Sequence, residues 1–99
     1  MAVLPVYNIL LAPDAALCIK TDTYKNMVNK DPQIGDRVTV VVAKSDVTKS
    51  QFTTESFYPI GINGEIADVN ASGFMMINLT NRVDIESLMV LPDRSIDIE

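Results

Sequence analysis

Histidine is absent from the sequence, and cysteine occurs only once. Without histidine, the chain lacks the general base that serine and cysteine nucleophiles most often use. The single cysteine, Cys18, excludes an intramolecular disulfide and any thiolate-rich metal site. We therefore expect neither a histidine-dependent active site nor a disulfide framework.

Long hydrophobic runs are missing as well. The longest uninterrupted apolar stretches, such as residues 40–43, are far below the roughly 20 residues that a membrane-spanning helix needs. The sequence also shows no cleavable signal pattern. Together with the lone cysteine, these absences predict a cytoplasmic protein that does not cross a membrane.

Basic residues are few and scattered along the chain. Eight lysines and arginines stand against thirteen aspartates and glutamates, which gives a formal net charge of −5. A field of this sign repels a phosphate backbone at long range. Nucleic-acid binding is therefore disfavoured, although a local basic patch stays open as an alternative.

Motifs for nucleotide or serine-lysine chemistry are weak or absent. None of the four glycines is followed by lysine, so the Gly-Lys-Ser/Thr loop that cradles phosphate is missing. Lys44 stands beside Ser45, and Lys49 beside Ser50. Adjacent side chains on an extended segment point to opposite sides, so neither pair is expected to form a catalytic dyad.

Two pairs of carboxylates occur at alternating positions, Asp84 with Glu86 and Asp97 with Glu99. Such pairs can hold a hard cation or perform acid-base chemistry. Both pairs are better explained as alternate, solvent-facing positions of exposed strands, where charged side chains are common. The sequence therefore predicts no enzyme activity, no catalytic residue, no cofactor and no metal site.

The composition predicts one folded domain over residues 1–99, since 47% of the residues are hydrophobic. A short helix is expected over residues 24–28, capped by Asp22 or Thr23 and ending before Pro32. Polar residues 45–56 lack periodicity and predict a mobile surface loop. Strand patterns cover residues 3–7, 17–20, 37–43 and 57–88, and residues 92–99 add one edge strand.

The ribbon over residues 57–88 turns at residues 70–73 and alternates apolar with polar side chains. Asn81 interrupts the apolar positions, which predicts a bend or bulge. Asn63 and Gly64 have hairpin-turn chemistry, but the flanking strands would be too short, so a bulge that curls the ribbon is preferred. The predicted core comprises Leu10, Leu17, Ile19, Val38, Val40, Val42, Ile77, Leu79, Val83 and Ile85.

Five or six short strands with one short helix predict a mainly β fold, a small closed or partly closed β-barrel. Closure removes sheet edges that would otherwise pair with other chains. Pro5 lacks an amide proton, so the first strand is expected at an edge or a strand start rather than in a central position.

Phe74 and Met76 alternate with the expected core residues of their strand. The other residues on their side of the strand are polar. If Ile77 enters the core, both side chains point outward near the hairpin tip. Methionine is deformable and suits varied apolar partners. Met89 extends the same candidate surface, so the predicted protein-binding patch is Phe74, Met76 and Met89. A register change that buries Phe74 and Met76 is an equally open alternative.

Residues 4–13 and 58–85 together resemble a known family. The first stretch reads Leu-Pro-Val-Tyr-Asn, then apolar residues and Pro13. It is similar to the opening of the amino-terminal domain of Lon proteases, and the second stretch is similar to that domain's long hairpin. The two stand in the family's order and at nearly its separation. Tyr7 and Ala12 replace the usual Arg and Phe, which puts specific contacts in doubt.

The resemblance implies a barrel of the pseudouridine-synthase-and-archaeosine-transglycosylase-like (PUA-like) type. It also implies a non-catalytic substrate-recognition domain that binds unfolded or degron-bearing proteins and serves ATP-dependent proteolysis. Self-association is a further expectation. Two alternatives stay open, a PUA-like RNA-binding module and a stand-alone adaptor or structural protein. The resemblance is compatible with an excised domain and with a complete small protein.

Overall fold

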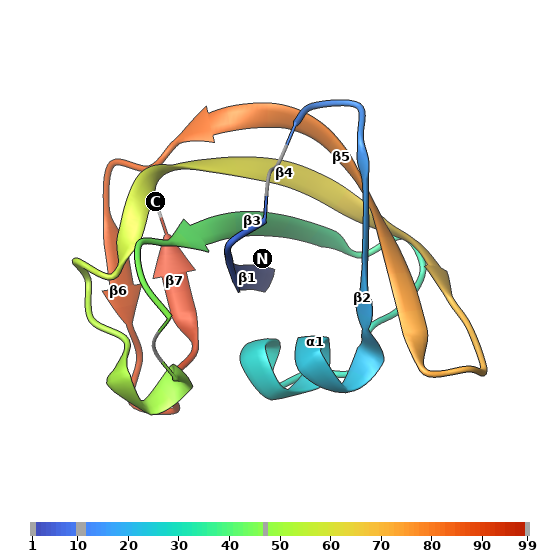
Figure 1. Ribbon diagram of the computed structural model, residues 1–99, viewed down its shortest axis with the longest axis horizontal. Helices are drawn as coiled ribbons and strands as arrows, with labels where there is room; N and C mark the ends of the chain where they lie inside the picture. The colour runs from blue at the N-terminus through green and yellow to red at the C-terminus, as the bar shows by residue number, and fades with distance from the viewer. Residues whose placement is uncertain (1, 10–11, 47, 99) are drawn as a thin grey trace.

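The computed structural model describes residues 2–9, 12–46 and 48–98, and these residues form a mainly β fold (Figure 1). The elements are β1 Ala2–Tyr7, β2 Ala16–Lys20, α1 Thr21–Val28, β3 Arg37–Ala43, the short 3-10 helix η1 Lys49–Gln51, β4 Phe57–Val69, β5 Phe74–Asp84, β6 Leu88–Val90 and β7 Ile96–Ile98. The predicted β-rich fold with one short α-helix is confirmed. The predicted barrel of five or six strands corresponds to a five-stranded main sheet, and among the described residues two further short strands form a separate sheet.

Five strands form one curled sheet in the order β1-β3-β4-β5-β2. β1 pairs with β3 in parallel, and every other neighbouring pair is antiparallel. The sheet arches over α1, and the helix contacts both terminal strands, β1 and β2 (Figure 1). The predicted partly closed barrel is confirmed, with Pro5 in an edge strand as expected.

Two hydrophobic cores lie on opposite faces of this sheet, because neighbouring residues of a strand point to opposite sides. The inner core, inside the curl, comprises Leu4, Leu17, Tyr24, Val38, Val40, Ile62, Ile66, Met75, Ile77 and Leu79. The outer core, against β6 and β7, comprises Val3, Val41, Ala43, Phe52, Phe57 and Ile96. β3 contributes to both, which explains its uninterrupted β-branched run.

Five of the predicted core residues are buried in the inner core, namely Leu17, Val38, Val40, Ile77 and Leu79. Ile19 and Val42 are only half-buried. Leu10 lies outside the described residues. The buried side chain at Val41 was not predicted, because a single-core pattern assigns it to the surface.

A bulge in β5 moves Val83 and Ile85 to the other face of the sheet. Between Leu79 and Arg82, β5 has one residue more than the facing part of β4. The bulge expected at Asn81 is therefore confirmed. The extra residue reverses the side-chain alternation, so Ile85 packs against the outer core. The prediction that Val83 and Ile85 share a core with Leu79 is wrong for this reason.

Asn63 and Gly64 lie inside β4, as the sequence predicted, but the extra residue of the bulge lies opposite them in β5 and not in β4. A Cβ atom at Gly64 would stand 2.8 Å from the carbonyl oxygen of Asn78. The two strands therefore approach closely enough at this point that only glycine fits.

Helix α1 begins earlier than predicted, at Thr21, and it has no side-chain cap. Its N-cap residue is Lys20, the last residue of β2, so strand and helix are continuous. The predicted caps Asp22 and Thr23 are wrong, because both lie in the first helical turn. Asp22 still favours the helix there through the positive end of the helix dipole.

The described part of residues 45–56 contains more order than the predicted mobile surface loop. The helix η1 lies within this segment, and the backbone N–H of Thr48 donates to the Gln51 side-chain oxygen at 3.0 Å. Phe52 is buried and meets the ring of Phe57 edge to face, with centroids 5.0 Å apart. A buried aromatic side chain anchors this segment, which local polarity alone does not reveal.

The C-terminal residues do not join the edge of the main sheet. β7 instead pairs antiparallel with β6 in a separate two-stranded sheet, with Leu88 opposite Ile98. Ile96 is buried in the outer core. The predicted edge strand over residues 92–99 is thus corrected to one half of a small hairpin, and Glu99 lies outside the described residues.

Candidate protein-binding surface

Phe74 and Met76 are exposed at the start of β5, directly after the β4–β5 turn. Their exposed fractions are 42% and 40%, whereas Met75 between them is 1% exposed. The side-chain oxygen of Asn70 accepts hydrogen bonds from the backbone N–H groups of Ser72 and Phe74, which fixes the turn. The structure therefore decides the open alternative in favour of outward-facing side chains.

The strand register shows which residues adjoin these two side chains. Met76 is paired with Cys18 of β2, and Phe74 is paired with Lys20. On the opposite side, Asp68 of β4 is paired with Met76. Directly paired residues point to the same face of a sheet. We call Cys18, Phe74 and Met76, all exposed, the hairpin patch.

Met89 does not join the hairpin patch. It is 55% exposed, but it lies on β6, at the far end of the molecule from the β4–β5 turn (Figure 1). The sequence grouped Met89 with Phe74 and Met76 because nothing in the alternation shows that a separate small sheet forms.

A second group of exposed apolar side chains lies at the other end of the main sheet. It comprises Tyr7, Ile9, Tyr58 and Ile60, with exposed fractions from 37% to 49%. Two shallow hollows adjoin it, and both are lined by Val42 and Tyr58. The Lys44 ammonium lies 5.9 Å from the Tyr58 ring centroid. We call Tyr7, Ile9, Tyr58 and Ile60 the tyrosine surface. Sequence reasoning missed it, because β4 changes register opposite the end of β3.

Polar side chains join three segments near the C-terminal end of α1. The Lys49 ammonium donates to the Asn26 carbonyl oxygen and, at 2.6 Å, to the Asn29 side-chain oxygen. The Asn29 amide donates in turn to the carbonyl oxygen of Asp93 at 3.3 Å. A cation suits the negative end of a helix dipole. Lys49 is thus directed at the helix end rather than arranged as a dyad with Ser50.

Arg94 completes this polar junction. Its guanidinium donates to the carbonyl oxygens of Lys49, Ser50 and Phe52, at 3.3, 3.0 and 2.6 Å. Next to it, hydrogen bonds from the Ser95 hydroxyl and backbone hold the pKa of the exposed Asp93 carboxyl below its usual value. We use the name polar junction for Asn29, Lys49, Asp93 and Arg94.

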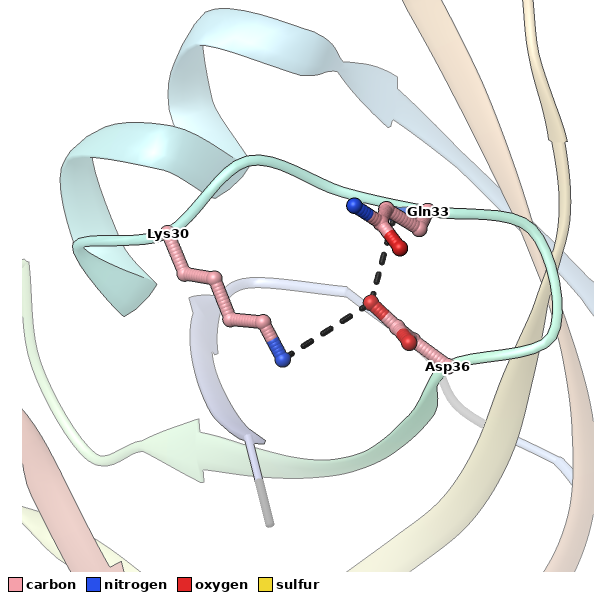
Figure 2. Close-up of polar contacts among 3 residues, drawn as sticks. All are labelled: Lys30, Gln33 and Asp36. Atoms are coloured by element: carbon pink, nitrogen blue, oxygen red, sulfur yellow. Dashed lines mark hydrogen bonds and ion pairs between the residues drawn. The ribbon is translucent and has the colours of Figure 1, made fainter.

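Asp36 organises the connection between α1 and β3. Its carboxylate lies 3.8 Å from the Lys30 ammonium and accepts the Gln33 backbone N–H at 3.3 Å (Figure 2). Burial, and secondarily the charge of Asp36, raises the pKa of Tyr24. The Tyr24 hydroxyl is buried and has no hydrogen-bond partner among the described residues. This arrangement is structural, since nothing in it resembles an acid-base pair.

The described residues contain no cluster of three metal-ligating side chains. Asp84 and Glu86 are both exposed, as solvated alternation predicts. Within the same ranges, no helix has the length and apolar character to span a membrane.

One comparison with solved structures finds a similar fold. The N-terminal domain of a Lon protease of the Mycobacterium avium complex superposes with a TM-score of 0.59 and 14% sequence identity. The alignment covers 99% of this chain and 51% of that one, so this chain spans about half its length. No protein-family profile matches the sequence, and no curated protein matches it. At this identity the likeness concerns the fold, and there it agrees with the resemblance seen in the sequence.

Proposed function

We propose that this chain is a non-catalytic substrate-recognition domain that binds exposed apolar segments of unfolded or degron-bearing proteins. The observation that carries the proposal is the exposed position of Phe74 and Met76 on a strand whose other exposed residues are polar. The fold shared with a Lon protease N-terminal domain supports the same function. A free, exposed Cys18 is compatible with a reducing cytoplasm as its location.

Weak and adaptable contact is the mode of binding that this surface suits. Met76 can repack around different apolar side chains, because its thioether chain is flexible and polarizable. The hairpin patch is small, so the affinity of one copy for one segment is expected to be low. Attachment to an oligomeric protease would raise the effective concentration of the client, and many weak contacts would then suffice.

The direct test replaces the two exposed side chains together. Phe74→Ser/Met76→Ser should weaken binding of reduced, carboxymethylated lysozyme by about tenfold or more, because apolar area is no longer buried on binding. Fluorescence anisotropy gives the dissociation constant. The thermal midpoint should stay nearly unchanged, since both side chains already face solvent.

The tyrosine surface provides a matched control. Tyr58→Ser/Ile60→Ser removes two apolar side chains of similar exposed fraction, 49% and 39%, from the other end of the sheet. This variant should retain the affinity of the wild-type protein. If it loses binding while the Phe74/Met76 variant keeps it, the hairpin patch is not the site. If neither variant loses affinity, apolar recognition by this sheet is refuted.

RNA binding is the weaker alternative. Glu65 and Asp68 are exposed on β4 beside the hairpin patch, and the formal net charge is −5. Both features oppose a polyanion. Binding of a single-stranded RNA that falls steeply with added salt would favour that alternative.

A further inference from the structure

The two edges of the main sheet differ in how they are protected. β1, at one edge, carries Pro5 and contacts both α1 and β7. Proline removes a backbone donor, which is a common way to prevent unwanted strand pairing. β2, at the other edge, also contacts α1, but among the described residues it pairs only with β5, has no contact with β7 of the kind that β1 makes, and contains no proline. β2 is therefore the more accessible edge for an additional strand.

Hydrogen bonds at its two ends show which backbone groups of β2 point outward. The N–H of Leu79 donates to the carbonyl oxygen of Ala15 at 2.8 Å, and the N–H of Thr21 donates to that of Gly73 at 2.9 Å. Residues of an antiparallel strand alternate between facing the partner strand and facing away. Leu17 and Ile19 thus face β5, whereas Ala16, Cys18 and Lys20 direct their backbone groups to the open side.

The outward groups of Ala16 and Cys18 have no backbone partner among the described residues. The carbonyl of Lys20 lies at the N-cap of α1, where it accepts the first helical bond. Each outward residue also places its side chain on the face of the hairpin patch, because Cys18 is paired with Met76 and Lys20 with Phe74. Open backbone groups and exposed apolar side chains therefore occur at the same place.

We propose that the open edge of β2 takes up an extended segment of the client polypeptide as a sixth strand of the main sheet. This inference rests on the proposed function and specifies how the client is held. Main-chain hydrogen bonds to Ala16 and Cys18 supply affinity for any sequence, and the hairpin patch selects apolar side chains at every second position. Such a mode explains how one small surface accepts many unfolded segments.

Charge around β2 determines which segments fit. Asp14 precedes the strand and Asp22 follows it, both exposed, and Lys20 is the one charged residue within the strand, so the three charges around β2 are negative on balance. In an antiparallel pairing of two copies centred on Cys18, the end of β2 near Asp14 in one copy would lie beside the end near Asp22 in the other, in chains that each carry −5. Like charges in that arrangement repel. The occupant is therefore an extended apolar segment flanked by lysine or arginine, not a second copy of this chain.

The first experiment blocks the edge without removing apolar surface. In Cys18→Pro the missing N–H is an outward one, so no hydrogen bond to β5 is lost. Cys18→Ala is the matched control, since it also removes the thiol but keeps the donor. The probe is the fluorescent peptide Lys-Thr-Val-Thr-Val-Thr-Val-Thr-Lys. Cys18→Pro should weaken its binding about tenfold, and Cys18→Ala should bind within about twofold of wild type.

The second experiment leaves the protein unchanged, so a folding defect in Cys18→Pro cannot obscure the result. One form of the peptide carries N-methyl groups on all three valines, and another carries them on three of the four threonines. Strand addition places the N–H groups of alternate residues against β2, so only one of the two forms should lose binding. Loss from the valine form indicates an antiparallel strand, and loss from the threonine form a parallel one.

Equal binding of both methylated peptides, or unimpaired binding by a folded Cys18→Pro, would overturn strand addition. The proposed function would still stand if Phe74→Ser/Met76→Ser lost affinity for carboxymethylated lysozyme. Absence of binding by the wild-type protein to either probe would overturn both. A dimer in sedimentation experiments that Cys18→Pro abolishes, without peptide binding, would identify a second copy as the occupant and refute the basic apolar segment.

Discussion

The hairpin patch and the polar junction use hydrogen bonds in opposite ways. At the polar junction, Lys49 and Arg94 direct their donors at five oxygen acceptors of the chain itself. At the hairpin patch, apolar side chains face solvent beside backbone groups of Cys18 that have no backbone partner in the described part of the chain. The first arrangement joins segments that are far apart in sequence and stabilises the fold. The second leaves binding capacity for another chain.

Both regions belong to a fold that depends on β3, the second strand of the main sheet. Val40 of β3 is fully buried in the inner core, and Val41 beside it is fully buried in the outer core. A change in β3 should therefore affect both regions together. A change within the polar junction should lower stability and leave binding intact, whereas a change within the hairpin patch should lower binding and leave stability nearly intact.

The largest effect is expected from Val40→Asp, which places an unpaired carboxylate in the inner core. The cost should be several kcal/mol, on the order of 4 or more, enough to unfold a domain of this size. Urea denaturation followed by circular dichroism measures it, with Val40→Ala as the milder control. An unchanged urea midpoint for Val40→Asp would contradict the assignment of Val40 to the core.

The next largest effect is expected at the polar junction. Arg94→Met keeps most of the aliphatic length but removes the guanidinium hydrogen bonds to three carbonyl oxygens, of which that of Lys49 still accepts the Phe52 N–H. We expect a loss of about 1–3 kcal/mol in the free energy of unfolding, because the interactions are partly buried. Arg82→Met, an exposed arginine on the main sheet, is the matched control. Peptide binding should be unaffected, and a binding defect as large as the stability defect would contradict the separation of the two regions.

The sequence predicted the parts of the fold that depend on local pattern. The β-branched run of β3 has the predicted bounds, and the bulge at Asn81 was signalled by a polar residue in an apolar alternation. Alternation counts positions without detecting the extra residue, so Ile85 was assigned to the wrong core. The order in residues 45–56 was missed because Arg94 reaches its three acceptors across 42 to 45 positions.

The candidate site was predicted in part. Alternation identified Phe74 and Met76 as outward candidates, but only the register with β2 and β4 shows that they are exposed. The open edge at Cys18 has no local signal at all. It follows from the strand order, which places the second strand of the sequence at the end of the sheet.

A smaller effect, on the pH dependence of stability, is expected from Tyr24, which is the titratable residue of the inner core. Burial raises the pKa of Tyr24, so the folded protein holds the phenolic proton more tightly than the unfolded chain. The resulting stability is fully present below the unfolded tyrosine pKa and is lost as the pH rises through the folded value. Tyr24→Phe should therefore show a weaker decline of the urea midpoint above about pH 10. A decline identical to that of the wild-type protein would exclude Tyr24 as its source.

The smallest effect is expected from Asp93 of the polar junction. Hydrogen bonds from Ser95 lower its pKa, so the folded protein favours the carboxylate relative to the unfolded chain. The corresponding stability is present above the unfolded aspartate pKa and is lost as the pH falls through the lower folded value. The urea midpoints of wild type and Asp93→Asn should thus differ slightly at pH 7, and the difference should shrink as the pH falls below the usual aspartate range. Asp97→Asn, which changes an exposed carboxylate on the neighbouring strand β7, is the control. Peptide binding should be the same in all three proteins at neutral pH, since the polar junction lies away from β2. A change in peptide affinity in Asp93→Asn alone would show that the two regions are energetically coupled.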